Sequence, residues 1–323
     1  MSRTEGQHYQ LRARRHNRAG YRGLVTRTNF SLNEDLQLAL RLADAADAIS
    51  RERFLAMDLE VTTKPDKTPV TDADRAVERA IMDLLAEERG SDYLLGEEFG
   101  EHPGRLAETP IETADHPHRQ WIIDPIDGTS NFLRGVPVWA TLISLAVDGI
   151  PVIGVVSAPA LGKRWWASKG NGAWVDESND PLAKIILPEG LASKIEQPMV
   201  AIAEPRRLSV SGVNSLADAS LSYNSLQQWD QAGYLTELVE LSRKVWRTRA
   251  YGDMWSYMMV AEGILDIAGE FALKPYDMAA LMPIVTEAGG AFTAVTGEAD
   301  VWHGSALATN GVLHSQVLEQ LAK

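Results

Sequence analysis

The sequence has 323 residues, of which 45% are apolar and 23% are charged, and this is enough material for a substantial buried core. Cysteine is absent, which excludes disulfides, thiolate metal sites and a cysteine nucleophile. The net charge of −13 disfavours a nucleic-acid-binding protein. No apolar run reaches the roughly 18 residues of a membrane span. We therefore expect a cytoplasmic protein with no nucleic-acid or membrane partner.

Residues 1–30 differ in composition from the rest of the chain. They hold seven arginines and a single acidic residue, Glu5. This pattern predicts a flexible tail; a transit peptide is the alternative, which the lack of a clear apolar face disfavours. We expect one catalytic domain over residues 31–323, with a metal-site half over about 31–160, a substrate-side half over about 161–323 and a surface insertion over about 176–207.

Helical periodicity begins at Ser31. Ser31 and Glu34 have the spacing of a capping box before a long helix with an apolar stripe, and Thr71 and Asp74 begin a second helix. Further on, the patterns predict strands over residues 93–95, 121–123, 139–147, 152–157 and 264–268, and helices over residues 230–246, 253–262 and 276–288. Helices and strands are mixed throughout, so the fold class is α/β or α+β with layered sheets.

The strongest chemical signal lies in residues 121–130. There an apolar run ends in two carboxylates, Asp124 and Asp127, which can converge on one cation. Mg²⁺ prefers hard oxygen ligands and keeps several waters, so two or three carboxylates and a backbone carbonyl are the expected share of the protein. Gly128, Thr129 and Ser130 follow, and their N–H and hydroxyl groups can donate to a phosphate. The alternative is an ordinary Asp-Gly turn after a strand.

Three other acidic positions could join this pair. Glu97 follows a short apolar run, while Asp74 and Asp277 each lie at the start of a predicted helix. Each position has a simpler interpretation, which is a solvated turn for Glu97 and helix capping for Asp74 and Asp277. Only their combination with Asp124 and Asp127 favours a functional site over these separate interpretations.

In order and spacing, these segments resemble the inositol monophosphatase family. Two stretches carry the resemblance: residues 121–132 (Trp-Ile-Ile-Asp-Pro-Ile-Asp-Gly-Thr-Ser-Asn-Phe) and residues 276–290 (Tyr-Asp-Met-Ala-Ala-Leu-Met-Pro-Ile-Val-Thr-Glu-Ala-Gly-Gly). The likeness runs from about Ser31 to the C-terminus. The arginine-rich leader and the insertion over residues 176–207 are not part of the family pattern. It implies alternating α-β-α-β-α layers, a phosphomonoesterase that uses two to three Mg²⁺ ions, with Mn²⁺ possible, and a homodimer.

The resemblance also implies roles for individual residues. The metal ligands, with Asp124 shared between two ions, would be Glu97, Asp124 and the carbonyl of Ile126 for one ion, and Asp124, Asp127 and Asp277 for the other. The group that positions the attacking water would be Glu97, Thr129 and Asp74. The substrate would contact Gly128, Thr129 and Ser130 through its phosphate, and Asp277 and Glu270 besides. A mobile loop that helps to close the site would contain Lys64, Asp66 and Lys67.

The implied chemistry is hydrolysis by a water that metal ions activate, with no covalent intermediate. Phosphomonoester hydrolysis passes through a loose transition state, so positioning and neutralisation of charge suffice. A phosphatase with an aspartyl nucleophile would have two aspartates separated by one residue, whereas Asp124 and Asp127 are three positions apart. The spacing therefore disfavours that rival mechanism.

The substrate is suggested by three further segments. Residues 134–143, 157–166 and 251–263 resemble the bacterial histidinol-phosphate phosphatases of the family, which implies hydrolysis of histidinol phosphate in histidine biosynthesis. An ammonium group and an imidazole suit carboxylates at the far end of the site, for which Glu270 and Asp253 are the candidates, with helix capping as the alternative for Asp253. Two other functions stay open: a phosphatase for inositol 1-phosphate or another small phosphomonoester, and a catalytically silent binding protein, which is expected to lack a metal carboxylate.

Overall fold

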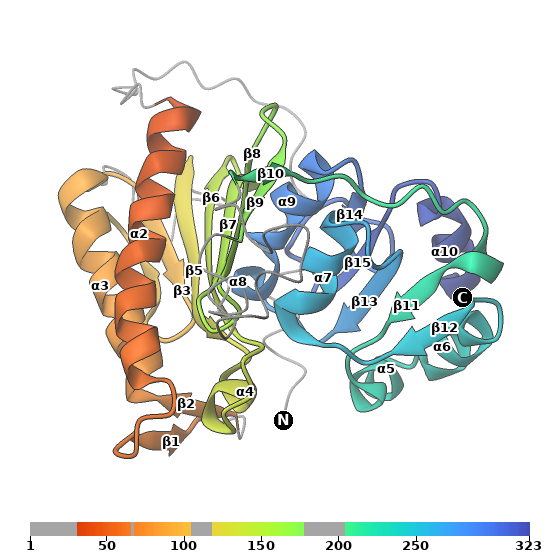
Figure 1. Ribbon diagram of the computed structural model, residues 1–323, viewed down its shortest axis with the longest axis horizontal. Coiled ribbons are helices and arrows are strands. Elements are labelled where there is room, and N and C mark those ends of the chain that lie inside the picture. The colour runs from red at the N-terminus through yellow and green to blue at the C-terminus, as the bar shows by residue number, and fades with distance from the viewer. Residues whose placement is uncertain (1–30, 66–67, 105–117, 178–203) are drawn as a thin grey trace, which may run out of the picture.

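Two β-sheets and three groups of helices alternate as five layers in the computed structural model (Figure 1). The structure describes residues 31–65, 68–104, 118–177 and 204–323. The leader over residues 1–30, Asp66, Lys67 and most of the predicted insertion lie outside these ranges. The layers are the α-β-α-β-α arrangement that the resemblance implied, which confirms the predicted fold class.

The first layer contains the two helices that the sequence predicts at the start of the domain. They are α2 (Leu32–Arg53) and α3 (Asp72–Glu88). Both begin at a complete capping box, formed by Ser31 with Glu34 and by Thr71 with Asp74. Their apolar stripes pack on one face of the larger sheet in a core that includes Leu38, Ile81 and Ile123. The capping signals therefore fixed the starts of both helices correctly.

The larger sheet has eight strands in the order β10-β9-β8-β7-β6-β5-β3-β4. In chain order the strands are β3 (Tyr93–Gly96), β4 (Gly100–His102), β5 (Arg119–Asp127), β6 (Ala140–Val147), β7 (Ile150–Ala158), β8 (Lys163–Ser168), β9 (Ala173–Asp176) and β10 (Arg206–Arg207). Only β3 and β5 are parallel neighbours in this sheet among the described strands, so their C-terminal ends meet at the same edge. A separate two-stranded sheet, β1 (Val61–Thr63) and β2 (Pro69–Thr71), lies before α3.

The middle layer contains α7 (Asp253–Ala261), α8 (Pro275–Met278) and α9 (Leu281–Glu287). The single helix predicted over residues 276–288 is wrong, because it is divided between α8 and α9. Pro283 has no N–H to donate to the carbonyl of Ala279, and that carbonyl accepts instead from the Ser144 hydroxyl at 3.0 Å. The α8–α9 junction packs so closely on the sheet that a Cβ at Gly154 would lie 2.1 Å from the carbonyl oxygen of Ala280.

The smaller sheet has five strands in the order β12-β11-β13-β15-β14. They are β11 (Ser220–Ser222), β12 (Arg247–Arg249), β13 (Ile267–Phe271), β14 (Ala291–Thr293) and β15 (Ser305–Thr309). The outer helices that cover it are α5 (Leu226–Gln231), α6 (Leu235–Ser242) and α10 (His314–Leu321), and a 3₁₀ turn spans Leu216–Asp218 (Figure 1). The strand predicted over residues 264–268 begins three residues too early, because residues 259–265 form the turn that ends α7.

The helix predicted over residues 230–246 is also wrong. Gly233, with φ at 76°, separates α5 from α6, and the chain then leaves the helix to form β12. The apolar residues on both sides of this break contribute to one core with Trp229 and Leu238, so the pattern resembled that of a continuous helix. Periodicity alone does not reveal such a break when both helices face the same core.

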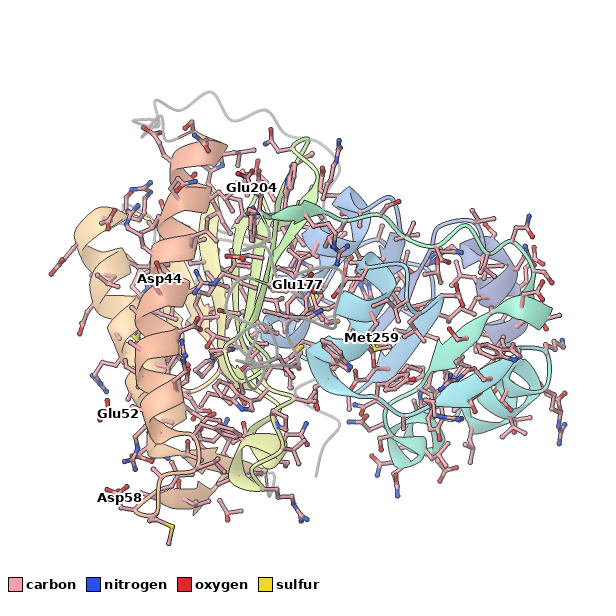
Figure 2. All side chains as sticks on the ribbon, in the orientation of Figure 1. Asp44, Glu52, Asp58, Glu177, Glu204 and Met259 are labelled. Atoms are coloured by element: carbon pink, nitrogen blue, oxygen red, sulfur yellow. The ribbon has the colours of Figure 1, made fainter. Side chains whose placement is uncertain are left out.

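Acidic side chains are spread over the surface (Figure 2). Asp44 and Glu52 lie on α2, Asp58 follows that helix, and Glu177 and Glu204 lie near β9 and β10. No helix of the described residues is both long and apolar enough to cross a membrane.

Candidate metal and phosphate site

A cavity of about 590 Å³ lies where the edge of the larger sheet faces α7 and the smaller sheet. Residues predicted for the site form much of its wall: Lys64, Glu97, Asp127, Gly128, Thr129, Ser130, Asp253, Glu270 and Asp277. Asp74, Asp124 and Ile126 are buried directly behind this wall. The fold therefore gathers at one place residues that are up to about 200 positions apart in the sequence.

The parallel pair β3 and β5 brings the first acidic residues together. Glu97 follows β3, and its N–H donates to the carbonyl oxygen of Ile123 on β5 at 3.2 Å. The pairing of β5 with β6 shifts register between Asp124 and Asp127. The Thr141 hydroxyl holds the shifted segment through the carbonyl oxygen of Pro125 at 2.8 Å. This irregularity at the strand end allows both aspartates to approach the cavity.

Asp124, Asp127 and Asp277 form the first acidic group, with carboxylate oxygens within 4.8 Å of one another. Asp127 accepts from the N–H of Met254 at 2.7 Å, and Asp277 accepts from the N–H of Lys274 at 2.6 Å. Oδ1 of Asp124 is buried and has no hydrogen-bond partner among the described residues. A buried carboxylate oxygen without a donor is costly, which indicates a position that a cation can occupy.

The electrostatics of this group support the same interpretation. Burial, followed by repulsion from neighbouring carboxylates, raises the pKa of both Asp124 and Asp127 well above their ordinary value. Burial also raises the pKa of Asp277, to about 6. Such a set favours binding of divalent cations, because positive charge removes the repulsion between the ionised carboxylates.

Asp74, Glu97 and Glu98 form the second acidic group, again with oxygens within 4.8 Å of one another. The ammonium of Lys64 lies 2.7 Å from Oε1 of Glu97 and 2.5 Å from Oε1 of Glu98. Burial raises the pKa of Glu97 to about 7, although the charge of Lys64 opposes this shift. Burial lowers the pKa of Lys64, but the two glutamates outweigh this effect and raise it overall. Lys64 thus provides one positive charge inside an acidic pocket.

Glu98 was not assigned a role from the sequence, although it lies in the same Gly-Glu-Glu run as Glu97. A third glutamate, Glu78 on α3, holds this turn by accepting from the N–H groups of Glu98 at 2.8 Å and Phe99 at 3.0 Å. A Cβ at Gly96 would lie 1.8 Å from Oε1 of Glu78, so any other residue there would displace the Glu78 carboxylate from this position. The apolar stripe of α3 gave no indication that Glu78 points inward.

Asp74 and Asp277 are both helix caps and members of the acidic groups. Oδ2 of Asp74 accepts from the N–H of Thr71 at 2.8 Å, while Oδ1 accepts from the hydroxyl of Thr129 at 3.3 Å. The same hydroxyl lies 3.0 Å from the carbonyl oxygen of Ile126. Capping and a role in the site are therefore compatible for these residues.

At the far end of the cavity, Asp253 and Glu270 face the space between α7 and β13. Oδ2 of Asp253 accepts from the side-chain amide of Asn131 at 2.7 Å, and α7 has no side-chain cap, so the capping alternative for Asp253 is wrong. Glu270 accepts from the amide of Asn224 and from the hydroxyl of Tyr257, the latter at 3.3 Å.

Burial and neighbouring carboxylates control the protonation of this end. Burial raises the pKa of Glu270 to about 8 and also raises the pKa of Asp253. No role was predicted from the sequence for the partners of these carboxylates. Asn131 lies inside the stretch that carries the family resemblance and could have been noticed there, whereas Asn224 and Tyr257 have no local signal.

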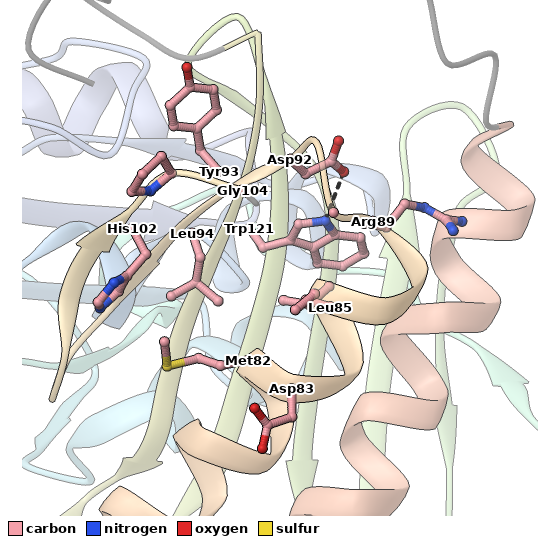
Figure 3. A pocket seen from close by; sticks show the side chains of 13 residues that line it. Met82, Asp83, Leu85, Arg89, Asp92, Tyr93, Leu94, His102, Gly104 and Trp121 are labelled. Atoms are coloured by element: carbon pink, nitrogen blue, oxygen red, sulfur yellow. Dashed lines mark hydrogen bonds between the residues drawn. The ribbon is translucent and has the colours of Figure 1, made fainter. Parts of the chain in front are cut away.

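A second, smaller cavity of about 190 Å³ lies beside α3 and β3 (Figure 3). Its wall includes Met82, Leu94 and Trp121, and the indole N–H of Trp121 donates to Oδ2 of Asp92 at 3.0 Å. None of the members of the two acidic groups found among the described residues lines it. The candidate site is therefore the larger cavity.

Comparisons with known proteins agree with this geometry. A family model described as the inositol monophosphatase family matches residues 31–323. A histidinol-phosphatase of Mycobacterium tuberculosis is 49% identical over 90% of this chain and 98% of its own length, and one of Streptomyces coelicolor is 47% identical over 89% and 97%. The solved structure of an inositol monophosphatase from Zymomonas mobilis is similar with a TM-score of 0.70 and 28% identity, covering 91% of this chain and all of that one.

Proposed function

Because the chain belongs to the inositol monophosphatase family, we propose that it is a phosphomonoesterase that hydrolyses L-histidinol phosphate to L-histidinol and inorganic phosphate. Two bacterial relatives that share almost half of their residues with it, over nearly their full length, carry the name histidinol-phosphatase. The structural observation that carries the proposal is the pair of carboxylates that line the cavity from α7 and β13, the half-buried Asp253 and the buried Glu270.

The two ends of the cavity match the two ends of this substrate. Gly128, Thr129 and Ser130 line the cavity at the sheet edge, where they would receive the phosphate. Histidinol phosphate carries an ammonium group and an imidazole at its other end, and carboxylates bind such groups through charge-assisted hydrogen bonds. A bound cation would favour the ionised form of Asp253 and Glu270, whose ionisation burial otherwise opposes.

We propose Mg²⁺ as the cofactor, in two or three copies, with Mn²⁺ as a possible substitute. The residues that would hold it are Glu97, Asp124, Asp127, Asp277 and the carbonyl of Ile126. The unpartnered oxygen of Asp124 and the all-oxygen donor set support this assignment. When bound, such ions supply Lewis acidity that neutralises developing negative charge and activates a water.

The residues of the chain would orient that water. The Thr129 hydroxyl donates its proton to Asp74 or to the Ile126 carbonyl, so its lone pairs are free to accept from a water. Glu97, whose side chain lines the cavity, would accept a second hydrogen bond from the same water. The water oxygen would bond to phosphorus in line while the P–O bond to the alcohol breaks. The proton that the water loses would end on the leaving histidinol oxygen, so histidinol and inorganic phosphate form without a covalent phosphoenzyme.

The first experiment measures phosphate release with Mg²⁺ from histidinol phosphate, inositol 1-phosphate, fructose 1,6-bisphosphate and 3′-phosphoadenosine 5′-phosphate. Preference is judged by kcat/KM. We expect histidinol phosphate to lead by about tenfold or more, which is about 1.4 kcal/mol of transition-state discrimination. A lead for inositol 1-phosphate would keep the family chemistry and reject the substrate. Absence of hydrolysis would favour a silent binding protein.

We further propose that the protein acts in the cytoplasm as a homodimer. The absence of cysteine and of a membrane-spanning helix among the described residues is compatible with the first point. Light scattering of the purified full chain at several concentrations tests the second, since a stable dimer has twice the mass of the 35.4 kDa chain.

A further inference from the structure

Asn131 connects the two ends of the cavity. It lies on α4 (Thr129–Leu133), directly after the segment that lines the phosphate end, and it touches Asp253, which lies 122 positions further along the chain. Asn131 is not among the residues that line the cavity. Its contacts show that it can determine where the carboxylate of Asp253 lies relative to the phosphate end.

The amide of Asn131 is fixed by two acceptors. Nδ2 donates to Oδ2 of Asp253 at 2.7 Å and to the carbonyl oxygen of Val138 at 2.8 Å, so both of its protons are used. The backbone N–H of Asn131 donates to the carbonyl oxygen of Gly128 at 2.8 Å. Asn131 is therefore attached to the phosphate-binding segment on one side and to Asp253 on the other.

Asp253 needs such a partner to keep its position. Its backbone has φ at 48°, in the left-handed region that a residue with a Cβ rarely occupies. Its carboxylate is near two other carboxylates, Asp127 and Glu270, and repels both. Without the amide of Asn131, repulsion and backbone strain would both favour movement of Asp253 away from the cavity.

We propose that Asn131 is a positioning residue, which holds Asp253 at a set distance from the phosphate-binding segment and thereby selects phosphomonoesters that carry an ammonium group at the matching distance. This inference rests on the proposed function, because Asp253 is its receptor for the ammonium group. It adds a residue that acts on specificity through another side chain and does not itself touch the substrate.

The test is a double-mutant cycle read on two substrates. Histidinol phosphate carries the ammonium group and glycerol 2-phosphate carries no cation, and the ratio of their kcat/KM values measures the preference. We expect Asn131→Ala to lower this preference about tenfold, mainly through a higher KM for histidinol phosphate. In an Asp253→Ala background, Asn131→Ala should change the preference no further, since Asn131 acts through Asp253.

Two further variants complete the experiment. Asn131→Asp has almost the same shape and replaces the donor with an anion that faces Asp253, so we expect it to lower the preference more than Asn131→Ala does. Asn131→Asp also tests the proposal if the Asn131→Ala variant does not fold. Asn171→Ala removes an amide that donates to the Ser168 hydroxyl at 2.9 Å, away from the cavity, and should leave the preference unchanged.

The outcomes separate the inference from the proposed function. A wild-type enzyme without preference for histidinol phosphate would reject the substrate, and the inference with it. A wild-type enzyme with that preference, combined with Asn131 variants that keep it, would reject the inference alone. Equal losses from Asn131→Ala in the wild-type and Asp253→Ala backgrounds would also reject it, because the effect would then come from the bond to Val138 and not from Asp253.

Discussion

The two ends of the cavity both contain buried carboxylates, but they differ in what surrounds them. At the sheet edge, Asp124 has a buried oxygen without a hydrogen-bond partner among the described residues, and its neighbours Asp127 and Asp277 accept from the backbone N–H groups of Met254 and Lys274. At the far end, Asp253 and Glu270 are each held by the side-chain amide of an asparagine. In the proposed function, the first arrangement would leave lone pairs for metal ions, whereas the second would orient carboxylates for one organic cation.

Burial of an acidic residue does not by itself reveal its ligand. Asp124 and Glu270 are buried, Asp127, Asp253 and Asp277 are half-buried, and desolvation is the largest cause of the raised pKa at each of them. In the proposed function, the donors that these carboxylates already have would distinguish a position for divalent ions from a position for an ammonium group.

The largest effect is expected at the metal end. Asp124→Asn should lower kcat about a thousandfold or more, because charge stabilisation by metal ions is worth several kcal/mol. Phosphate release from histidinol phosphate measures it, with Asp218→Asn, an exposed aspartate distant from the cavity, as the matched control. Full activity of Asp124→Asn would contradict the proposed metal site.

A smaller and selective effect is expected at the far end. Asp253→Asn should lower kcat/KM for histidinol phosphate about 10- to 100-fold, since a hydrogen bond to a charged group contributes about 1.5–3 kcal/mol. The loss for glycerol 2-phosphate should be much smaller. The exposed Asp230 on α5 provides the matched control as Asp230→Asn. Equal losses on both substrates would show that Asp253 contributes to catalysis at the metal end and not to recognition of the ammonium group.

Metal binding should also stabilise the folded protein. A ligand present at 100 times its Kd adds about 2.7 kcal/mol to the free energy of unfolding, so saturating Mg²⁺ should raise Tm by on the order of 5 °C over protein in EDTA. Thermal unfolding followed by circular dichroism measures this shift. We expect it in Asp253→Asn and not in Asp124→Asn. An identical shift in both variants would place the bound ions elsewhere.

The smallest effect concerns pH. The carboxyl of Glu270 stays protonated in the folded protein up to about pH 8, whereas its ordinary pKa is 4.5. Between these values the folded state binds more protons than the unfolded state, so the contribution of Glu270 to stability is complete below pH 4.5 and is lost as pH rises through about 8. Glu270→Gln should therefore be more stable than wild type at pH 9 and nearly equal to it at pH 4.

Urea unfolding in EDTA measures this difference, because removal of metal ions leaves the carboxylates without external cations. Glu101→Gln, at an exposed position on β4, is the control and should behave like wild type at both pH values. A Glu270→Gln variant that is less stable than wild type at pH 9 would mean that the ionised carboxylate is stabilised by its partners more than burial penalises it.

The metal end could be predicted from the sequence to a large extent. Asp124, Asp127 and Thr129 lie within one short segment, and the strand before them ends beside the strand that leads to Glu97. Capping motifs at Ser31 and Thr71 fixed two helix starts. Lys64 was expected to help close the site, but its contact with Glu98 could not be anticipated, because it joins two segments that only folding brings together.

By itself the sequence determined the fold class, the starts of the first helices and the pair Asp124 and Asp127, because periodicity, caps and closely spaced ligands are visible along the chain. The resemblance to the family, and no local pattern, joined Asp74, Glu97 and Asp277 to that pair, and Glu98 was not included. Only the tertiary structure decided where the helices over residues 230–246 and 276–288 divide and which amides hold Asp253 and Glu270. Those outcomes depend on how the two sheets pack, and packing joins residues that no local pattern relates.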